Sequence, residues 1–174
     1  YQCDPNETLW FPETDTILWS MWGCDSAVEV DRQSGELLRQ FGQLPESYAF
    51  DPPEAGFDMQ HYPTFTADGT LLVSTHIQGE GGQQRAREFE IDDESQTLVQ
   101  IWSYGEEVPH YATYAGEAIR LPGGNTLINY GSSGDIREVT PDKQTAWEVA
   151  WSATYLIGHV NPVESLYDIN RGPP

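Results

Sequence analysis

The stretch EAIRLPGGNTLI, residues 117–128, joins two short apolar runs through a Pro-Gly-Gly-Asn turn. Gly and Asn tolerate the positive φ angles of tight turns, so this pattern predicts a hairpin of two antiparallel strands. The same order of signals occurs twice more, with turns at residues 13–15 and 67–69. The threonines that begin the second strand of each copy, Thr16, Thr70 and Thr126, lie 54 and 56 residues apart and mark equivalent positions.

Each copy continues with two more strand-like segments. They cover residues 27–31 and 37–41 in the first copy, 88–92 and 98–104 in the second, and 136–140 and 145–151 in the third. Val28 and Val30 alternate with Glu29 and Asp31, as in a strand with one buried face. Four short strands per repeat of this length are typical of a propeller blade. The sequence therefore predicts an all-β, β-propeller-like fold.

About three four-stranded blades fit into the chain, fewer than the four to eight with which propellers usually close. We expect a single domain over residues 1–174, with blades at about 7–44, 58–106 and 114–152 and a closing strand at 153–168. Residues 43–60 and 105–115 are expected to be irregular loops between blades. An open part of a ring exposes sheet faces and edges, so we expect either that the chain is a fragment of a longer protein or that a homo-oligomer or a partner half completes the propeller.

The charge of the chain restricts its partners. The formal net charge is −20, with 28 acidic residues against eight basic ones. An acidic protein repels polyanions, which excludes nucleic acid and anionic membranes as favoured partners. No apolar run approaches the length of a membrane helix. The acidity itself is typical of a surface that stays hydrated in a salty medium, and the alternative is an acidic binding face.

Only two cysteines are present, Cys3 and Cys24, and they flank the first strand pair. An isolated pair without the spacing of a metal site predicts one disulfide and a secreted or periplasmic protein. The alternative is two separate buried thiols, because cysteine is among the most buried residue types.

Three stretches resemble the arylsulfotransferases of the aryl-sulfate sulfotransferase type. They are Gln60-His61 with residues 67–73, the strand 85–92 with Trp102-Ser103-Tyr104-Gly105 after it, and residues 116–131 with 136–142. The resemblance covers residues 57–167 and implies the C-terminal half of a six-bladed propeller. It also implies transfer of a sulfuryl group from an aryl sulfate to a phenol through a sulfated histidine, with no cofactor.

The resemblance assigns roles to two residues. His61 matches a histidine of the family's site and is the candidate catalytic imidazole, and Arg85 matches the arginine expected to hold the sulfate. Where blade three would supply a further histidine, this chain has Gly116-Glu117. We expect His76, His110 and His159 to be structural or exposed, and an aryl sulfate or a phenolic small molecule to be the ligand.

Other functions remain open. A non-catalytic propeller module for ligand or protein binding in a secreted protein is the main alternative, because a fold does not fix a function. A quinone-dependent dehydrogenase is a weaker option that rests only on tryptophan-bearing strands such as residues 146–148. The acidic runs at 51–54 and 92–94 lack the spacing of an EF-hand loop, so no metal site is predicted.

Overall fold

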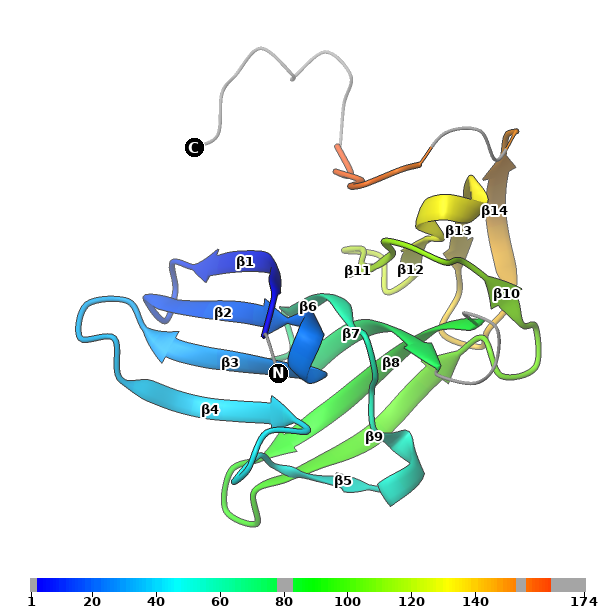
Figure 1. Ribbon diagram of the computed structural model, residues 1–174. Helices are drawn as coiled ribbons and strands as arrows, with labels where there is room; N and C mark the ends of the chain where they lie inside the picture. The colour runs from blue at the N-terminus through cyan, green and yellow to red at the C-terminus, as the bar shows by residue number, and fades with distance from the viewer. Residues whose placement is uncertain (1–2, 78–82, 153–155, 164–174) are drawn as a thin grey trace.

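Each of the three repeats folds into a sheet of its own. The computed structural model describes residues 3–77, 83–152 and 156–163 and is nearly all β, with three antiparallel four-stranded units (Figure 1). Blade one contains β1 (Pro5–Phe11), β2 (Thr16–Met21), β3 (Ser26–Asp31) and β4 (Leu37–Gly42). Blade two contains β6 (His61–Phe65), β7 (Leu71–Ile77), β8 (Gln83–Asp92) and β9 (Thr97–Tyr104), and blade three contains β11 (Glu117–Arg120), β12 (Thr126–Asn129), β13 (Asp135–Val139) and β14 (Thr145–Ala150). The predicted propeller-like fold is confirmed.

Two short strands extend blade two beyond four. β5 (Ala49–Asp51) pairs in parallel with β9, and β10 (His110–Tyr111) pairs with β8. Both lie in segments that the sequence predicts to be irregular loops, so that prediction is wrong for these residues. β5 is held because Phe50 packs edge-on against Phe57, with ring centroids 5.3 Å apart, and against Phe89 at 5.7 Å.

Apolar side chains fill the two interfaces between blades. Leu18 and Phe41 of blade one pack against Leu71 and Phe89 of blade two in one buried cluster. The opposite face of blade two packs on blade three in a second cluster, which contains Leu72, Ala86, Tyr104, Ala118, Ile128, Tyr130 and Val139. Alternate residues of β7 and β8 therefore face different blades, because successive side chains of a strand point to opposite sides of the sheet.

The first strand of each blade lies on the inside of the arc. The sheets fan out from a common centre, where β1 and β11 flank β6, and both neighbours contact β6 (Figure 1). Residues near the start of these inner strands come from distant parts of the sequence and meet at this centre.

The sequence predicts a closing strand at residues 153–168, and the part of this range that the structure describes is not a strand. Residues 156–163 form no strand, and residues 153–155 and 164–168 lie outside the described residues. The segment is held by single contacts instead of a ladder: the Ile157 amide donates to the Gly131 carbonyl (3.3 Å), and the Val160 amide donates to the Glu117 carboxylate (2.7 Å). Pro162 in this segment has no N–H to donate to a ladder.

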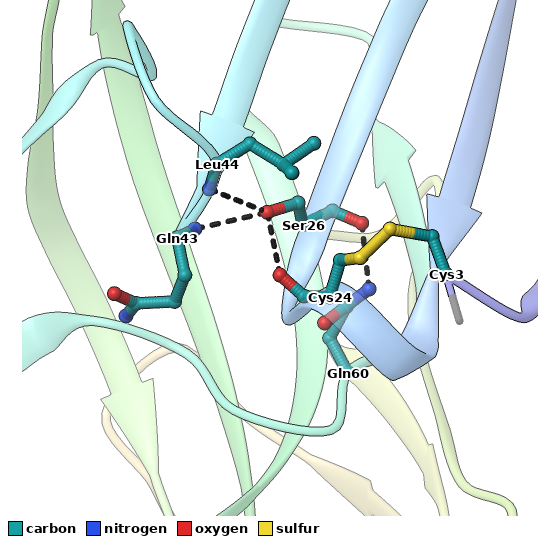
Figure 2. Close-up of a disulfide and its surroundings, with 6 residues drawn as sticks. All are labelled: Cys3, Cys24, Ser26, Gln43, Leu44 and Gln60. Atoms are coloured by element: carbon teal, nitrogen blue, oxygen red, sulfur yellow. Dashed lines mark hydrogen bonds between the residues drawn. A yellow bond between two sulfur atoms is a disulfide. The ribbon is translucent and has the colours of Figure 1, made fainter. Parts of the chain in front are cut away.

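A disulfide joins Cys3 to Cys24, with Cα atoms 5.0 Å apart, and confirms the predicted bond (Figure 2). It ties the residues before β1 to the short 3-10 helix η1 (Trp22–Cys24) that follows β2. The other helical elements are η2 (Pro53–Ala55) and η3 (Gly131–Ser133). In the part of the chain that the structure describes, no helix is long and apolar enough to cross a membrane.

Large apolar side chains remain exposed on the two outward blade faces. Trp10 and Trp19 lie on the face of blade one that turns away from blade two and are 58% and 39% exposed. Trp147 of β14 is 49% exposed on the corresponding face of blade three.

Candidate functional site

Polar and titratable side chains gather where the inner strands begin. Side-chain contacts connect blade one to blade two, and they connect blade two to blade three through residues 156–163, which follow blade three. We call this set the inner-end cluster; it consists of Asn6, His61, Tyr62, His76, Glu117 and His159.

Gln60 fixes the start of β6 against blade one. Its side chain is fully buried, and its amide donates to the Ser20 hydroxyl (3.1 Å) and to the Ser26 carbonyl (2.8 Å). Figure 2 shows the Gln60 side chain reaching Ser26 beside the Cys3–Cys24 disulfide. The next residue, His61, is thereby held at the junction of the two blades.

Asn6 determines which nitrogen of His61 carries the proton. The Asn6 Nδ2 group donates to the Gln60 carbonyl (3.0 Å), which can only accept, so the orientation of the amide is fixed. The same Nδ2 group lies 2.9 Å from His61 Nδ1. Nδ1 must then accept, and the single proton of a neutral His61 ring lies on Nε2. His61 is a hydrogen-bond donor at Nε2 in this arrangement.

His76 is the second histidine of the cluster and lies 5.3 Å from His61 between ring centroids. Its Nε2 donates to the Ala115 carbonyl (2.9 Å) across the boundary with blade three. Burial, and to a lesser extent the neighbouring His76, lowers the pKa of His61 from 6.5 to about 4. Burial also lowers the pKa of His76, and hydrogen bonds to the backbone of Ala115 and Ala112 offset part of this shift. Both rings are therefore neutral at pH 7.

Tyr62 departs from ordinary strand geometry. Its φ is +50°, which is uncommon for a bulky residue, and the pairing of β6 with β7 shifts register between His61 and Thr64. Such a bulge re-aims a side chain. The Tyr62 ring lies 5.6 Å from the His159 ring. Burial first, and then the negative charges of Glu117 and Glu7, raise the pKa of Tyr62. Tyr62 is thus an un-ionised phenol at neutral pH.

Glu117 begins β11 and is only 3% exposed. Its Oε2 accepts from the Val160 amide (2.7 Å) and from Asn129 Nδ2 (3.2 Å), and its Oε1 is hydrogen-bonded to His159 Nδ1. A buried carboxylate needs such partners, since an unpaired one is costly to desolvate.

The structure places Arg85 on the other face of blade two from His76. On β8, the Gln84 side chain faces blade three, because its Nε2 donates to the Asn129 carbonyl (2.7 Å). Gln84 is paired with His76 of β7, so the His76 side chain lies on this same face. Arg85 shares a face with Arg87, whose Nη1 donates to the Gly56 carbonyl (2.5 Å) on the side of blade one. The Nη2 group of Arg85 donates to Gln83 Oε1 (3.0 Å). His61 has a second histidine beside it, whereas Arg85 points to the opposite side of the sheet from that histidine.

Sequence reasoning missed most of the inner-end cluster. It sets His76 and His159 aside as structural or exposed, and it treats Glu117 only as the residue that replaces an expected histidine. That replacement was the one available signal, because it places a titratable group at the start of the third inner strand. His110 lies away from the cluster, with its ring 4.2 Å from that of Tyr130 and Nε2 3.1 Å from the Ser133 hydroxyl. Among the described residues, no group of three or more His, Cys, Asp or Glu side chains is arranged to hold a metal ion.

The chain is similar in structure to several solved proteins, but it matches no protein family by sequence. No protein-family model matches the chain, and no curated protein matches it significantly. The solved structures that resemble it include the periplasmic gluconolactonase of Pseudomonas aeruginosa (TM-score 0.56, 17% identity, 87% of this chain and 41% of that one). They also include 6-phosphogluconolactonase-like proteins of Bacteroides fragilis (TM-score 0.54, 11% identity, 86% and 40%) and Bacteroides uniformis (0.53, 12%, 86% and 41%).

These similarities are to β-propellers, and at such identities they show the fold alone. The chain spans about two fifths of the length of each of these proteins. The resemblance to arylsulfotransferases stays a prediction. The described chain is thus a set of three β-propeller blades whose inner strands converge on a histidine-containing cluster.

Proposed function

We propose that the chain is a β-propeller module that binds a small phenolic molecule at the inner-end cluster. The observation that carries the proposal is the pair of bonds from Asn6, which puts the ring proton of His61 on Nε2. The cluster therefore offers an imidazole N–H donor from His61 and, from the next residue, the aromatic ring of Tyr62, and this combination suits a ligand that has both an aromatic ring and an oxygen acceptor. In a propeller such inner strands surround the central channel.

Charge favours a neutral phenol over an aryl sulfate. The charges that raise the pKa of Tyr62 are the carboxylates Glu117 and Glu7, and the chain as a whole carries −20. A sulfate group would meet this negative potential, whereas an un-ionised phenol would not.

Sulfuryl transfer from an aryl sulfate to a phenol through His61 is the second candidate. It is supported by the lowered pKa of His61, about 4, which keeps the ring unprotonated, as a nucleophile must be. Two features speak for the binding module instead. The His61 lone pair at Nδ1 already accepts from Asn6, and Arg85 lies on the opposite face of the sheet from His76.

Calorimetric titration with 4-nitrophenol and with 4-nitrophenyl sulfate tests the first proposal. We expect the phenol to bind more tightly than the sulfate, and His61→Asn, which keeps an acceptor for Asn6 but removes the Nε2 donor, to weaken phenol binding about fivefold or more. His110→Asn is the matched control and should bind like the wild type. Equal affinities of wild type and His61→Asn would contradict the proposal.

A transfer assay on the same proteins separates the two candidates. With 4-nitrophenyl sulfate as donor and phenol as acceptor, release of 4-nitrophenol that disappears in His61→Asn would establish the transferase. Phenol binding without turnover would establish the binding module.

We propose a secreted or periplasmic location on the basis of the Cys3–Cys24 disulfide, because such bonds persist in oxidising compartments. A homo-oligomer or partner half that completes the ring stays a prediction. It would cover the exposed faces around Trp19 and Trp147, and sedimentation at several salt concentrations tests it.

A further inference from the structure

Glu117 and His159 form a carboxylate–imidazole pair at one side of the inner-end cluster. The two residues are 42 positions apart, and neither belongs to the blade that carries His61. A carboxylate only accepts hydrogen bonds, so His159 must donate from Nδ1. In the neutral ring this leaves the lone pair on Nε2. His159 therefore has the opposite tautomer to His61.

Both partners of the pair are held in position. The Glu117 carboxylate is fixed by Val160 N and by Asn129 Nδ2, which also donates to the Ile157 carbonyl (3.3 Å). Asn129 itself is anchored because its Oδ1 accepts from the Gly131 amide (2.9 Å). The segment that carries His159 is thus bonded to blade three on both sides of the histidine.

More than half of the His159 side chain is exposed, and Nε2 has no hydrogen-bond partner among the described residues. The His159 side chain is 56% exposed although its carboxylate partner is 4% exposed, and its ring lies beside Tyr62. Enzyme sites use an imidazole oriented by a buried carboxylate in this way to accept protons, because the carboxylate stabilises the imidazolium that forms.

We infer that the Glu117–His159 pair is a proton acceptor for the hydroxyl group of the bound phenol. His159 Nε2 touches the ligand, and Glu117 acts through it as a positioning residue. The phenolic O–H bond breaks, an N–H bond forms at Nε2, and the electron pair stays on the phenolic oxygen. The products are a phenolate and an imidazolium whose Nδ1–H remains bonded to Glu117. The net charge of the site is unchanged by the transfer, and the phenolate lies against the new cation. No further reactant is needed.

This inference rests on the proposed function, and it adds a residue and a chemical step to it. The competing view is that His159 only anchors the segment to blade three. His159→Asn separates the two views, since an asparagine amide can still donate to Glu117 but offers no basic nitrogen at the position of Nε2.

The spectrum of bound 4-nitrophenol is the test, because its phenolate absorbs visible light and its neutral form does not. At a pH where free 4-nitrophenol is mostly protonated, we expect wild-type protein to produce a phenolate signal that saturates with the calorimetric binding curve. At saturating 4-nitrophenol, His159→Asn should lose the signal, and it should bind the phenol more weakly than wild type because the contact between phenolate and imidazolium is gone. Glu117→Gln should reduce it at least about tenfold, and Glu36→Gln, at an exposed position, should leave it unchanged.

The outcomes are distinguishable. Binding without a phenolate signal in the wild type, or an undiminished signal in His159→Asn, overturns this inference and leaves the proposed function standing. Absence of binding to the wild type overturns both. Nitrogen-detected NMR of the histidine rings gives a ligand-independent measurement: we expect the proton on Nδ1 of His159 and on Nε2 of His61, and a proton on Nε2 of His159 contradicts the inference.

Discussion

Replacement of His61 by asparagine should flatten the pH dependence of stability on the acid side. The pKa of His61 is about 4 in the folded protein against 6.5 for the free side chain, chiefly because the ring is buried. Between these values the unfolded chain binds a proton that the folded protein does not, so the free energy of unfolding falls as the pH decreases through this window. From pH 7.5 to pH 5 the His61 contribution to this loss is about 2 kcal/mol.

Urea denaturation of wild type and His61→Asn at both pH values measures the effect. The many carboxylates also titrate, but they do so in both proteins and cancel in the comparison. We expect the wild type to lose about 2 kcal/mol more than the variant. NMR titration of the His61 ring should give a midpoint near 4. Parallel losses in the two proteins, or a midpoint near 6.5, would refute the argument that His61 is held neutral by burial.

Two further predictions concern stability. The double variant Cys3→Ser with Cys24→Ser opens a loop whose ends are 21 residues apart, and it should lower the free energy of unfolding, measured in urea, by about 3 kcal/mol. Reduction of the wild-type disulfide should have the same effect, and unchanged stability would show that the bond does not constrain the unfolded chain. Arg120→Met removes the cation that pairs with the buried Glu88 carboxylate between blades two and three and should cost about 3 kcal/mol. Adding Glu88→Gln should restore part of that loss, and a double variant less stable than the single one would contradict this reasoning.

The blades were predictable because their signals are local. Thr16 and Thr126 begin β2 and β12, and Thr70 directly precedes β7, so turn residues followed by apolar runs located the second strand of every blade. β5 and β10 were missed because three and two residues are too few for an alternating pattern. β5 is held by its pairing with β9 and by the packing of Phe50 on Phe57 and Phe89, contacts that no local pattern reveals.

The site was less predictable because its contacts span long separations. His61 was identified through a resemblance in its motif, but its neighbours Asn6 and His76 come from other strands, and the tautomer depends on one bond from blade one. Glu117 and His159 are 42 residues apart. Their pairing could be found only from the course of the backbone over residues 156–163, where the sequence predicted a strand.

The disulfide also bears on the chemistry of the neighbouring blade. Cys3 precedes Asn6 by three residues, and the bond to Cys24 tethers the end of the strand from which Asn6 reaches His61. In a reducing medium this tether is lost, and Asn6 keeps only noncovalent restraints. Reduction of Cys3 and Cys24 is then expected to change how firmly the ring proton of His61 is kept on Nε2. The site in blade two is thereby linked to the redox conditions outside the protein.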